Sequence, residues 1–374
     1  MWLRRYASLA AAVALVLGSS DSSSNGAMLS TLRFKTSVTI LRLHRLLLFL
    51  SRAHTGVVSI YDLSLIAFLL SRSASPINLS DECRKLNIFA VDEAETKHLQ
   101  ALEGAETRLH LFQIDLLDYE SLVSALVDCS GVFHLASPCI VDQVRDPEKE
   151  LLDPAIKGTT NVLRAAKEVG IGRVVVTSSS SAIMPSPSWP ADKVKNEDCW
   201  TDIEYCKQNG LWYPLSKTLA EKAAWDFAKG EGLDVVVVNP GTVMGPLISP
   251  RLNASMLMLV RLLQGCTETY ENFFMGSVHF KDAALAHVMV YENKAATGRH
   301  LCVEAISHYG DFVAMVAELY PDYNIPRLPR DTQPGLLRAK DGGKKLADLG
   351  LEFISMEKII TDAVESLKNK GFIS

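Results

Sequence analysis

The chain has 374 residues, of which 48% are hydrophobic and 22% are charged, so it carries ample material for a globular core. Its formal net charge of −5 argues against a nucleic-acid-binding protein, because such proteins present a surplus of basic residues. The seven cysteines lack the spacing of a metal site, which predicts reduced thiols, a cytoplasmic location and no bound metal. Cys199 and Cys206 could form a redox pair, although separate buried thiols are the favoured interpretation.

The first 80 residues differ in charge from the rest of the chain. They hold eight lysines and arginines against two acids, Asp21 and Asp62, although the whole chain is acidic. Such an asymmetry indicates a boundary. Residues 1–5 are basic and residues 7–17 are apolar, which is typical of a secretory signal; an organelle transit segment or residues from a wrongly assembled gene would have a similar composition.

Two later apolar runs lie in the same segment, at residues 38–50 and 57–70. Both are shorter than the ~20 residues that a bilayer core requires. Arg42, Arg45 and Asp62 interrupt them. We therefore expect no membrane span.

From residue 109 onward, strand and helix patterns alternate. The predicted elements are strands at 109–114, 131–135, 173–177 and 235–239, and helices at 118–127, 154–168 and 214–229. Pro154 suits a first helical turn, and Gly170 ends that helix. In the third helix we predict an inward-facing stripe of Leu215, Leu219, Ala223 and Phe227. The alternation predicts an α/β protein with a Rossmann-like, doubly wound parallel sheet and helices on both faces.

Connections lengthen beyond Gly245, and prolines cluster between residues 321 and 334. This pattern predicts a smaller C-terminal region that covers the substrate, mainly residues 245–374. A last helix is predicted at residues 356–368, with Ser355 as its N-cap and Gly371 as its end.

Three side chains are predicted to meet at one edge of the sheet. Tyr213 is the only one of the ten tyrosines with a lysine four residues later, Lys217, and this spacing puts both on one helix face. A fixed cation beside a phenol favours the phenolate, which makes tyrosine a faster proton donor or acceptor near neutral pH. Ser179 follows the predicted strand at 173–177, at the edge where α/β sheets bind ligands. We interpret the three as a carbonyl-reducing site; an amphipathic surface is the alternative for the Tyr–Lys pair.

Several segments carry a resemblance to a known family. They are residues 133–138 (FHLASP), 158–163 (GTTNVL), 177–179 (TSS), 199–202 (CWTD), 211–221 (LWYPLSKTLAE), 239–242 (NPGT), 278–282 (VHFKD) and 368–372 (KNKGF). From about residue 93 onward, the chain resembles the extended short-chain dehydrogenase/reductases, specifically the plant cinnamoyl-CoA reductase-like and dihydroflavonol reductase-like group.

The resemblance implies NADPH as cofactor and Ser179, Tyr213 and Lys217 as catalytic residues. It also implies a set of cofactor contacts, namely Asp115, Leu116, Leu135, Ala136, Ser137, Lys217, Pro240, Gly241 and Thr242. His279, Asp282 and His287 belong to or follow a family motif, and for these histidines a structural role is the favoured interpretation.

The family opens with a strand, a glycine-rich turn and a helix, and this chain departs from that pattern. The first 110 residues contain only four glycines, at positions 18, 26, 56 and 104, which are too far apart for the turn. We therefore expect the first βαβ unit to be atypical or missing. The expected domains are a divergent segment at residues 1–92 and an NAD(P)-binding reductase domain at residues 93–374.

The predicted function is NADPH-dependent reduction of a small-molecule aldehyde or ketone by hydride transfer. The motif at residues 211–217 differs from the one in authentic cinnamoyl-CoA reductases, which favours such a carbonyl over a CoA thioester. Two alternatives remain. A member without the glycine-rich turn could act as a binding protein or be non-functional, and a sugar-nucleotide epimerase or dehydratase would use similar Ser/Tyr/Lys chemistry.

Overall fold

The structure is a computed structural model, and it describes residues 46–49, 86–89, 97, 99–102, 105–112, 114–140, 144–190, 193–249, 252–265, 274–325 and 340–374. These residues all fall within one compact unit, His44–Ser374. The predicted signal or transit segment lies outside the described residues, as does the apolar run at 57–70. Within the part of the chain that is described, no helix combines the length and the hydropathy needed to cross a membrane.

The main sheet is built from seven of the described strands. They are β1 (Leu46–Phe49), β2 (Leu86–Phe89), β3 (Leu109–Phe112), β4 (Gly131–His134), β5 (Val174–Thr177), β6 (Val235–Pro240) and β9 (Gly298–Cys302). Their order is β3-β2-β1-β4-β5-β6-β9, and every neighbouring pair is parallel. This is the order of a doubly wound sheet, in which the strand sequence reverses between β1 and β4. The predicted fold class is confirmed.

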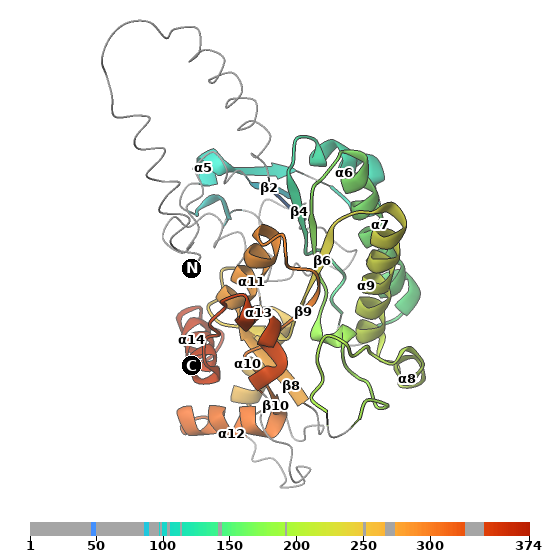
Figure 1. Cartoon of the computed structure of the whole chain (residues 1–374). Coiled ribbons are helices and arrows are strands. Elements are labelled where there is room, and N and C mark those ends of the chain that lie inside the picture. The colour runs from blue at the N-terminus through green and yellow to red at the C-terminus, as the bar shows by residue number, and fades with distance from the viewer. Residues whose placement is uncertain are drawn as a thin grey trace, which may run out of the picture. The chain divides into compact units, whose positions relative to one another are not determined.

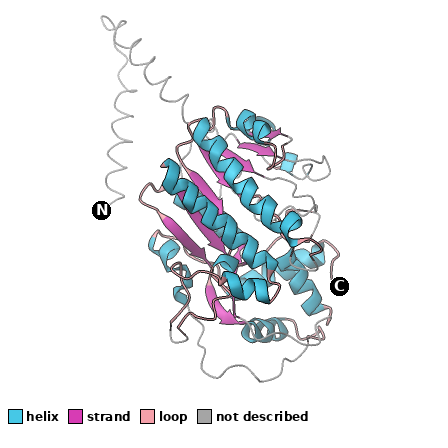
Figure 2. Cartoon of the chain, turned by 90° about the vertical axis from the view of Figure 1, so that its right-hand side faces the viewer, coloured by secondary structure: helices cyan, strands magenta, loops and turns pink. Residues whose placement is uncertain are grey.

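The central strands are buried on both faces, which explains their continuous apolar runs. Val174, Val176 and Val237 pack with the helices α6 (Tyr119–Leu126), α7 (Asp153–Glu168) and α9 (Trp212–Glu231). The alternate residues Val175 and Val236 pack on the opposite face with α11 (Phe280–Glu292). Figure 2 shows the long helices of the first group lying across the strands on one face of the sheet.

The first two strands were not predicted from the sequence. β1 lies between β2 and β4, with Leu46 in register with both Leu86 and Gly131. Of the two alternatives for the first βαβ unit, a missing pair of strands is therefore wrong, and the residues between β1 and β2 lie outside the described part. The physical reason for the missed strands is that a four-residue apolar run such as Leu46–Phe49 has no distinctive period of its own.

A second, three-stranded sheet extends the fold toward the C-terminus. Its strands β7 (Thr242–Met244), β8 (Phe274–His279) and β10 (Ala305–His308) have the order β10-β8-β7. β8 is antiparallel to β10 and parallel to β7. The chain therefore passes from the main sheet to the second one through Gly241, the single residue between β6 and β7.

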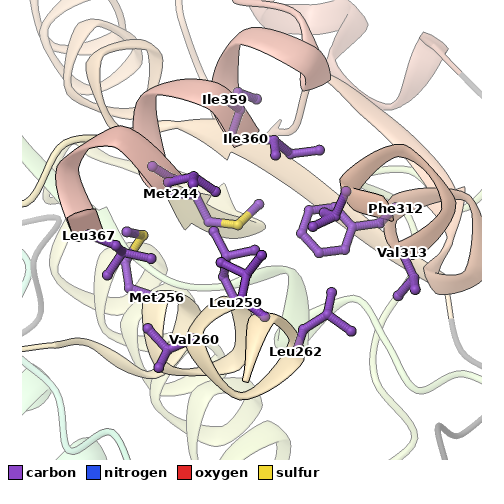
Figure 3. Packing of buried hydrophobic residues seen from close by; sticks show 14 of the residues in the cluster. Met244, Met256, Leu259, Val260, Leu262, Phe312, Val313, Ile359, Ile360 and Leu367 are labelled. Carbon is purple, nitrogen blue, oxygen red and sulfur yellow. The ribbon is translucent and has the colours of Figure 1, made fainter. Parts of the chain in front are cut away.

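Three helices pack with this sheet around a separate hydrophobic cluster. They are α10 (Ala254–Leu263), α12 (Tyr309–Leu319) and α14 (Met356–Asn369). Figure 3 shows Met244 from β7 facing Leu259 of α10, Phe312 of α12 and Ile360 of α14. The predicted cap of the last helix is confirmed, because the Ser355 side chain accepts a hydrogen bond from the Lys358 amide.

The remaining described elements are short. They are the helices α5 (Ala105–Arg108), α8 (Ile203–Gln208) and α13 (Lys344–Asp348), and the helical turns η2 (Glu148–Leu152), η3 (Ser180–Ala182) and η4 (Lys340–Gly343). The turn η3 begins three residues after the end of β5 and packs against α9, the helix that lies beside α7 in Figure 1.

The buried face of α9 differs from the predicted stripe. Leu215 is buried as expected, but Leu219, Ala223 and Phe227 are only partly buried. The buried face instead carries polar side chains among small apolar ones, in the set Leu215, Ser216, Lys217, Thr218, Ala220, Glu221 and Ala224. The predicted stripe is therefore confirmed only in part: Leu219 and Phe227 pack against hydrophobic clusters but stay partly exposed, because polar side chains share the buried face.

Candidate active site

Ser179, Tyr213 and Lys217 lie on two elements that pack together. Ser179 follows the carboxyl end of β5 and caps η3, where its Oγ accepts a hydrogen bond from the Ser181 amide at 3.1 Å. Tyr213 and Lys217 lie in the first two turns of α9, which packs against η3. Two segments that are far apart in the sequence are thus adjacent at the carboxyl edge of the sheet, as predicted.

Lys217 is buried, with 6% of its surface exposed. Its Nζ donates a hydrogen bond to the Thr177 carbonyl oxygen at 3.0 Å, two residues before Ser179. This bond ties α9 to the end of β5 and holds a positive charge where little water can reach it. A buried, directed ammonium of this kind can influence a neighbouring phenol far more than an exposed one.

Thr177 is held in turn by His287 of α11. The Thr177 hydroxyl lies 2.7 Å from His287 Nε2, and His287 Nδ1 lies 2.6 Å from the Ala283 carbonyl oxygen. Because a carbonyl only accepts, Nδ1 carries the proton and Nε2 accepts from Thr177. Burial lowers the pKa of His287 to about 4, which keeps the ring neutral. The expected structural role of this histidine is confirmed.

His279 and Asp282 connect α11 to the C-terminal part of the chain. His279 Nδ1 accepts from the Lys281 amide at 3.1 Å and so caps α11. Burial lowers the pKa of His279 to about 4. The Asp282 carboxylate accepts from the Ile354 amide at 2.8 Å, and burial raises its pKa to about 6. These bonds fit a structural role, as predicted for His279.

A small cavity adjoins Lys217 on the side of β4. It is lined by the ends of β4 and β5 and by two helices, α7 and α9, through His134, Ala136, Ser137, Thr159, Val176, Thr177, Ser178, Lys217, Ala220 and Glu221. Burial lowers the pKa of His134 to about 3, and the charge of Lys217 adds to this effect. The neutral His134 has its Nε2 at 3.0 Å from the Thr159 hydroxyl.

The cavity brings together part of the predicted cofactor set, namely Ala136, Ser137 and Lys217. The Ser137 hydroxyl is buried and has no hydrogen-bond partner among the described residues. A buried polar group without a partner is costly, so this hydroxyl indicates a bound polar group. The Leu135 side chain packs into the hydrophobic cluster that contains α11 residues, and a contact of its backbone with the cofactor stays a prediction.

Asp115 and Leu116 follow the end of β3, and two strands separate β3 from β4, whose end lines the cavity. The Asp115 carboxylate accepts from the Leu117 amide at 2.8 Å, and Asn161 donates to the Leu116 carbonyl oxygen at 3.0 Å. Leu116 also packs against Gly158, where an added Cβ would lie 2.9 Å from its side chain. Whether these residues contact a cofactor stays a prediction.

Pro240, Gly241 and Thr242 form the crossing between the two sheets. The Gly241 amide donates to the Cys302 carbonyl oxygen at 3.1 Å. An added Cβ on Gly241 would lie 2.1 Å from the Gly276 carbonyl oxygen, so close packing of the backbone explains the glycine here. The cofactor contacts predicted for this segment remain untested.

The two cysteines considered as a redox pair are separate buried thiols. Cys199 and Cys206 belong to different hydrophobic clusters and neither forms a disulfide. Burial raises the pKa of Cys206 to about 11. Among the described residues, no three His, Cys, Asp or Glu side chains gather into a metal site.

Sequence reasoning missed a buried ion pair between Glu221 and Arg299, which lies next to the proposed catalytic residues. Glu221 follows Lys217 by one helical turn and shares its face, so the i, i+4 rule could have found it. Arg299 lies in β9 and had no comparable signal, because its partner is 78 residues away in the chain.

A family model supplies the identification. Residues 78–303 match the model described as the NAD dependent epimerase/dehydratase family, which is more than half of the chain. The chain belongs to the NAD dependent epimerase/dehydratase family. The resemblance found in the sequence is thereby confirmed, and the match begins upstream of β2, which agrees with the presence of that strand.

Reductases of this family are similar to the chain in sequence and in structure. Cinnamoyl-CoA reductase 1 of Petunia hybrida is 43% identical over 283 residues, covering 75% of this chain and 84% of the relative. Vestitone reductase from alfalfa superposes with a TM-score of 0.71 at 28% identity, covering 88% of this chain and 99% of the other. Gre2 of Candida albicans in complex with NADPH superposes with a TM-score of 0.69 at 26% identity, covering 87% and 99%.

Proposed function

We propose that this chain is an NADPH-dependent oxidoreductase that reduces an aldehyde or ketone through Ser179, Tyr213 and Lys217. The observation that carries the proposal is the buried Lys217 ammonium, held 3.0 Å from the Thr177 carbonyl oxygen, with Tyr213 one turn earlier on the same helix. Ser179 lies two residues beyond the carbonyl that Lys217 contacts. The family relatives, which are named as reductases, support the same chemistry.

When bound, the reduced nicotinamide supplies the hydride to the carbonyl carbon. The Ser179 hydroxyl donates a hydrogen bond to the carbonyl oxygen of the substrate and so fixes its position. Tyr213 gives its phenolic proton to that oxygen as negative charge develops there. Lys217 stabilises the phenolate that Tyr213 becomes, because an adjacent cation favours the charged form.

Ser137 and Lys217 are the residues in the cavity that would hold the cofactor. The partnerless Ser137 hydroxyl and the buried Lys217 ammonium are a donor set that suits the hydroxyl groups of a ribose. The structural neighbour in complex with NADPH supports this choice of cofactor. The glycine-rich turn of the family would follow β1, and the first glycine after Phe49 is Gly56, in the undescribed stretch.

The substrate class is an aldehyde or a ketone rather than a CoA thioester. The departure at residues 211–217 from the motif of authentic cinnamoyl-CoA reductases supports this choice, although such reductases are among the chain's relatives. We place the reaction in the cytoplasm, and the absence of a disulfide among the five described cysteines agrees with a reducing compartment.

The test uses the purified full-length chain, titrated with NADPH and then assayed with cinnamaldehyde, isovaleraldehyde and cinnamoyl-CoA. We expect saturable NADPH binding and faster NADPH oxidation with the aldehydes than with the thioester. No saturable binding would exclude a working reductase. Binding without turnover of any of the three would favour the alternative of a catalytically impaired member that acts as a binding protein.

Tyr213→Phe then identifies the proton donor. It should lower kcat by at least ~10²-fold while leaving NADPH binding and the fold intact, because one hydroxyl is removed. Tyr205→Phe is the matched control, since Tyr205 is 38% exposed on α8 and should keep wild-type kcat. A Tyr213→Phe variant that retains activity would mean that another group supplies the proton.

A further inference from the structure

We propose that Glu221 and Arg299 are positioning residues of this reductase, which hold the Ser179 turn in place against the helix that carries Tyr213 and Lys217. The inference rests on the proposed function, since it concerns the same site. Neither residue needs to touch the substrate for this role.

The Glu221 carboxylate joins α9 to three strands of the main sheet. Glu221 is 1% exposed. Its Oε2 accepts from the Ser178 hydroxyl at 2.5 Å and from Asn239 Nδ2 at 2.8 Å, and its Oε1 accepts from Arg299 Nε at 2.6 Å. These three donors come from the end of β5, from β6 and from β9. One side chain on α9 therefore sets the position of the helix against the strand ends.

Arg299 extends this network to the loop on the far side of η3. Its Nη1 donates to the carbonyl oxygens of Glu197 and Cys199, at 2.8 and 2.6 Å, and its Nη2 donates to that of Ala182 at 3.1 Å. The guanidinium also lies over the Trp200 ring, 3.9 Å from its centroid. The planar fork of arginine is what allows three carbonyls and one carboxylate to be bound at once.

The network holds the Ser179 turn at both of its ends. On one side, Ser178 bonds Glu221 directly, and Asn239 bonds both Glu221 and the Ser179 carbonyl oxygen, the latter at 3.2 Å. On the other side, Arg299 binds the Ala182 carbonyl. The distance between the Ser179 hydroxyl and the helix of Tyr213 is therefore fixed by directional bonds, which tolerate less displacement than apolar packing.

A contribution to stability does not account for such a pair. The cost of desolvating two buried charges offsets most of their attraction, so a buried ion pair adds little to the free energy of unfolding. Fixed geometry is the property that a buried, fully bonded pair can supply beside a reacting group. A second buried arginine in the same protein allows the two roles to be separated.

Arg173 is that internal control. It is 2% exposed, pairs with Asp234 at 2.8 Å and donates to the carbonyl oxygens of Val290 and Asn293 at 2.7 and 2.8 Å. It immediately precedes β5, at the end opposite to Ser179. Arg173→Lys and Arg299→Lys are thus the same substitution at two buried arginines, one far from the proposed site and one close to it. Their partners differ, since the Asp234 side chain is 41% exposed and the Glu221 side chain is buried.

Each variant is assayed with NADPH and cinnamaldehyde, and kcat is normalised to the NADPH-binding sites found by titration. We expect Arg299→Lys to lower kcat by about 10²-fold, because a displacement of about 1 Å has that effect on catalysis. We expect Arg173→Lys to keep wild-type kcat per binding site. Equal kcat values in both variants would refute the positioning role, since a merely structural residue changes the amount of folded protein and not its turnover.

Amide hydrogen exchange supplies a readout that needs no turnover. The Ala182 and Ile183 amides bond the carbonyls of Ser179 and Ser180, both at 2.9 Å. Their protection should fall in Arg299→Lys and persist in Arg173→Lys; unchanged protection in both would overturn the inference even if kcat fell. If the wild-type chain is inactive but the two variants still differ in exchange, the proposed function is contradicted. The role of Glu221 and Arg299 in holding the Ser179 turn is then still supported.

Discussion

Lys217 brings a positive charge to the carboxyl end of β5, in a place that is shielded from water. A hydrogen bond to the Thr177 carbonyl oxygen locates its ammonium. From that position its charge adds to burial, which is the larger cause, in lowering the pKa of His134. His134 and Lys217 line the same cavity, so the charge acts within the space assigned to the cofactor.

Lys217→Met removes this charge and keeps a long apolar stem. We expect kcat to fall by ~10²-fold or more, because the phenolate of Tyr213 loses its stabilising cation. The pKa of His134 should rise from about 3 but stay below 6.5, since burial remains the larger cause. Steady-state kinetics and an NMR titration of the His134 ring measure the two effects. Lys229→Met, at an exposed position on α9, is the control, and an unchanged His134 pKa in Lys217→Met would count against the assigned position of the ammonium.

The helix α9 illustrates how an element can be oriented by its polar face. Its buried residues include Lys217 and Glu221, which bond to the ends of β5, β6 and β9. Its C-terminus is closed by Gly232 in the left-handed conformation, with φ of 65°. The hydrogen bonds of Lys217 and Glu221 therefore fix the rotation of α9 about its own axis. The left-handed conformation of Gly232 fixes where the helix ends.

We predict opposite effects on stability for alanine substitutions at two glycines near this end of α9. Gly230 lies within the helix and an added Cβ would contact nothing within 4 Å, so Gly230→Ala should raise the free energy of unfolding by about 0.5–1 kcal/mol. Gly232→Ala should lower it by about 1 kcal/mol, because alanine is strained in the left-handed region. Urea denaturation compares the two variants directly. Shifts of the same sign would show that α9 does not end at Gly232.

The whole molecule contains several buried histidines that are neutral in the folded state. Burial lowers the pKa of His134 to about 3 and those of His279 and His287 to about 4. In the unfolded chain each titrates near 6.5. Asp282 acts in the opposite direction, because burial raises its pKa to about 6 in the folded protein.

We predict that the protein loses stability as the pH falls from 7 to 4. Below pH 6.5 the unfolded chain binds protons at three histidines that the folded protein keeps neutral, which favours unfolding. Below pH 6 the folded protein gains one proton at Asp282 before the unfolded chain does, which offsets about one histidine. The net loss is on the order of 2 kcal/mol per pH unit. Urea unfolding at matched ionic strength measures it, and a flat profile between pH 7 and 5 would contradict the assigned burial.

Local patterns determined most of the fold. The runs 173–177 and 235–239 predicted strands buried on both faces, and both are central strands of the sheet. Pro154, Ser355 and Gly371 marked helix ends that the structure has within a residue or two. Such signals involve residues that are close together in the sequence, so they can be recognised without knowledge of the tertiary contacts. β1 and β2 were missed because a run of four mostly apolar residues becomes a strand only through pairing with its neighbours.

For the candidate site, the sequence by itself determined which residue types could act and which segments carry them: Ser179 after a strand, and Tyr213 with Lys217 on a helix. Only the tertiary structure decided what holds them, because the partners that Glu221 has on the strands of the sheet lie 18 to 78 residues away in the chain. It also decided that Lys217 faces the end of β5 and that His287 supports Thr177. Hydrogen bonds between distant segments leave no periodic trace in a sequence, since they depend on where whole elements come to lie.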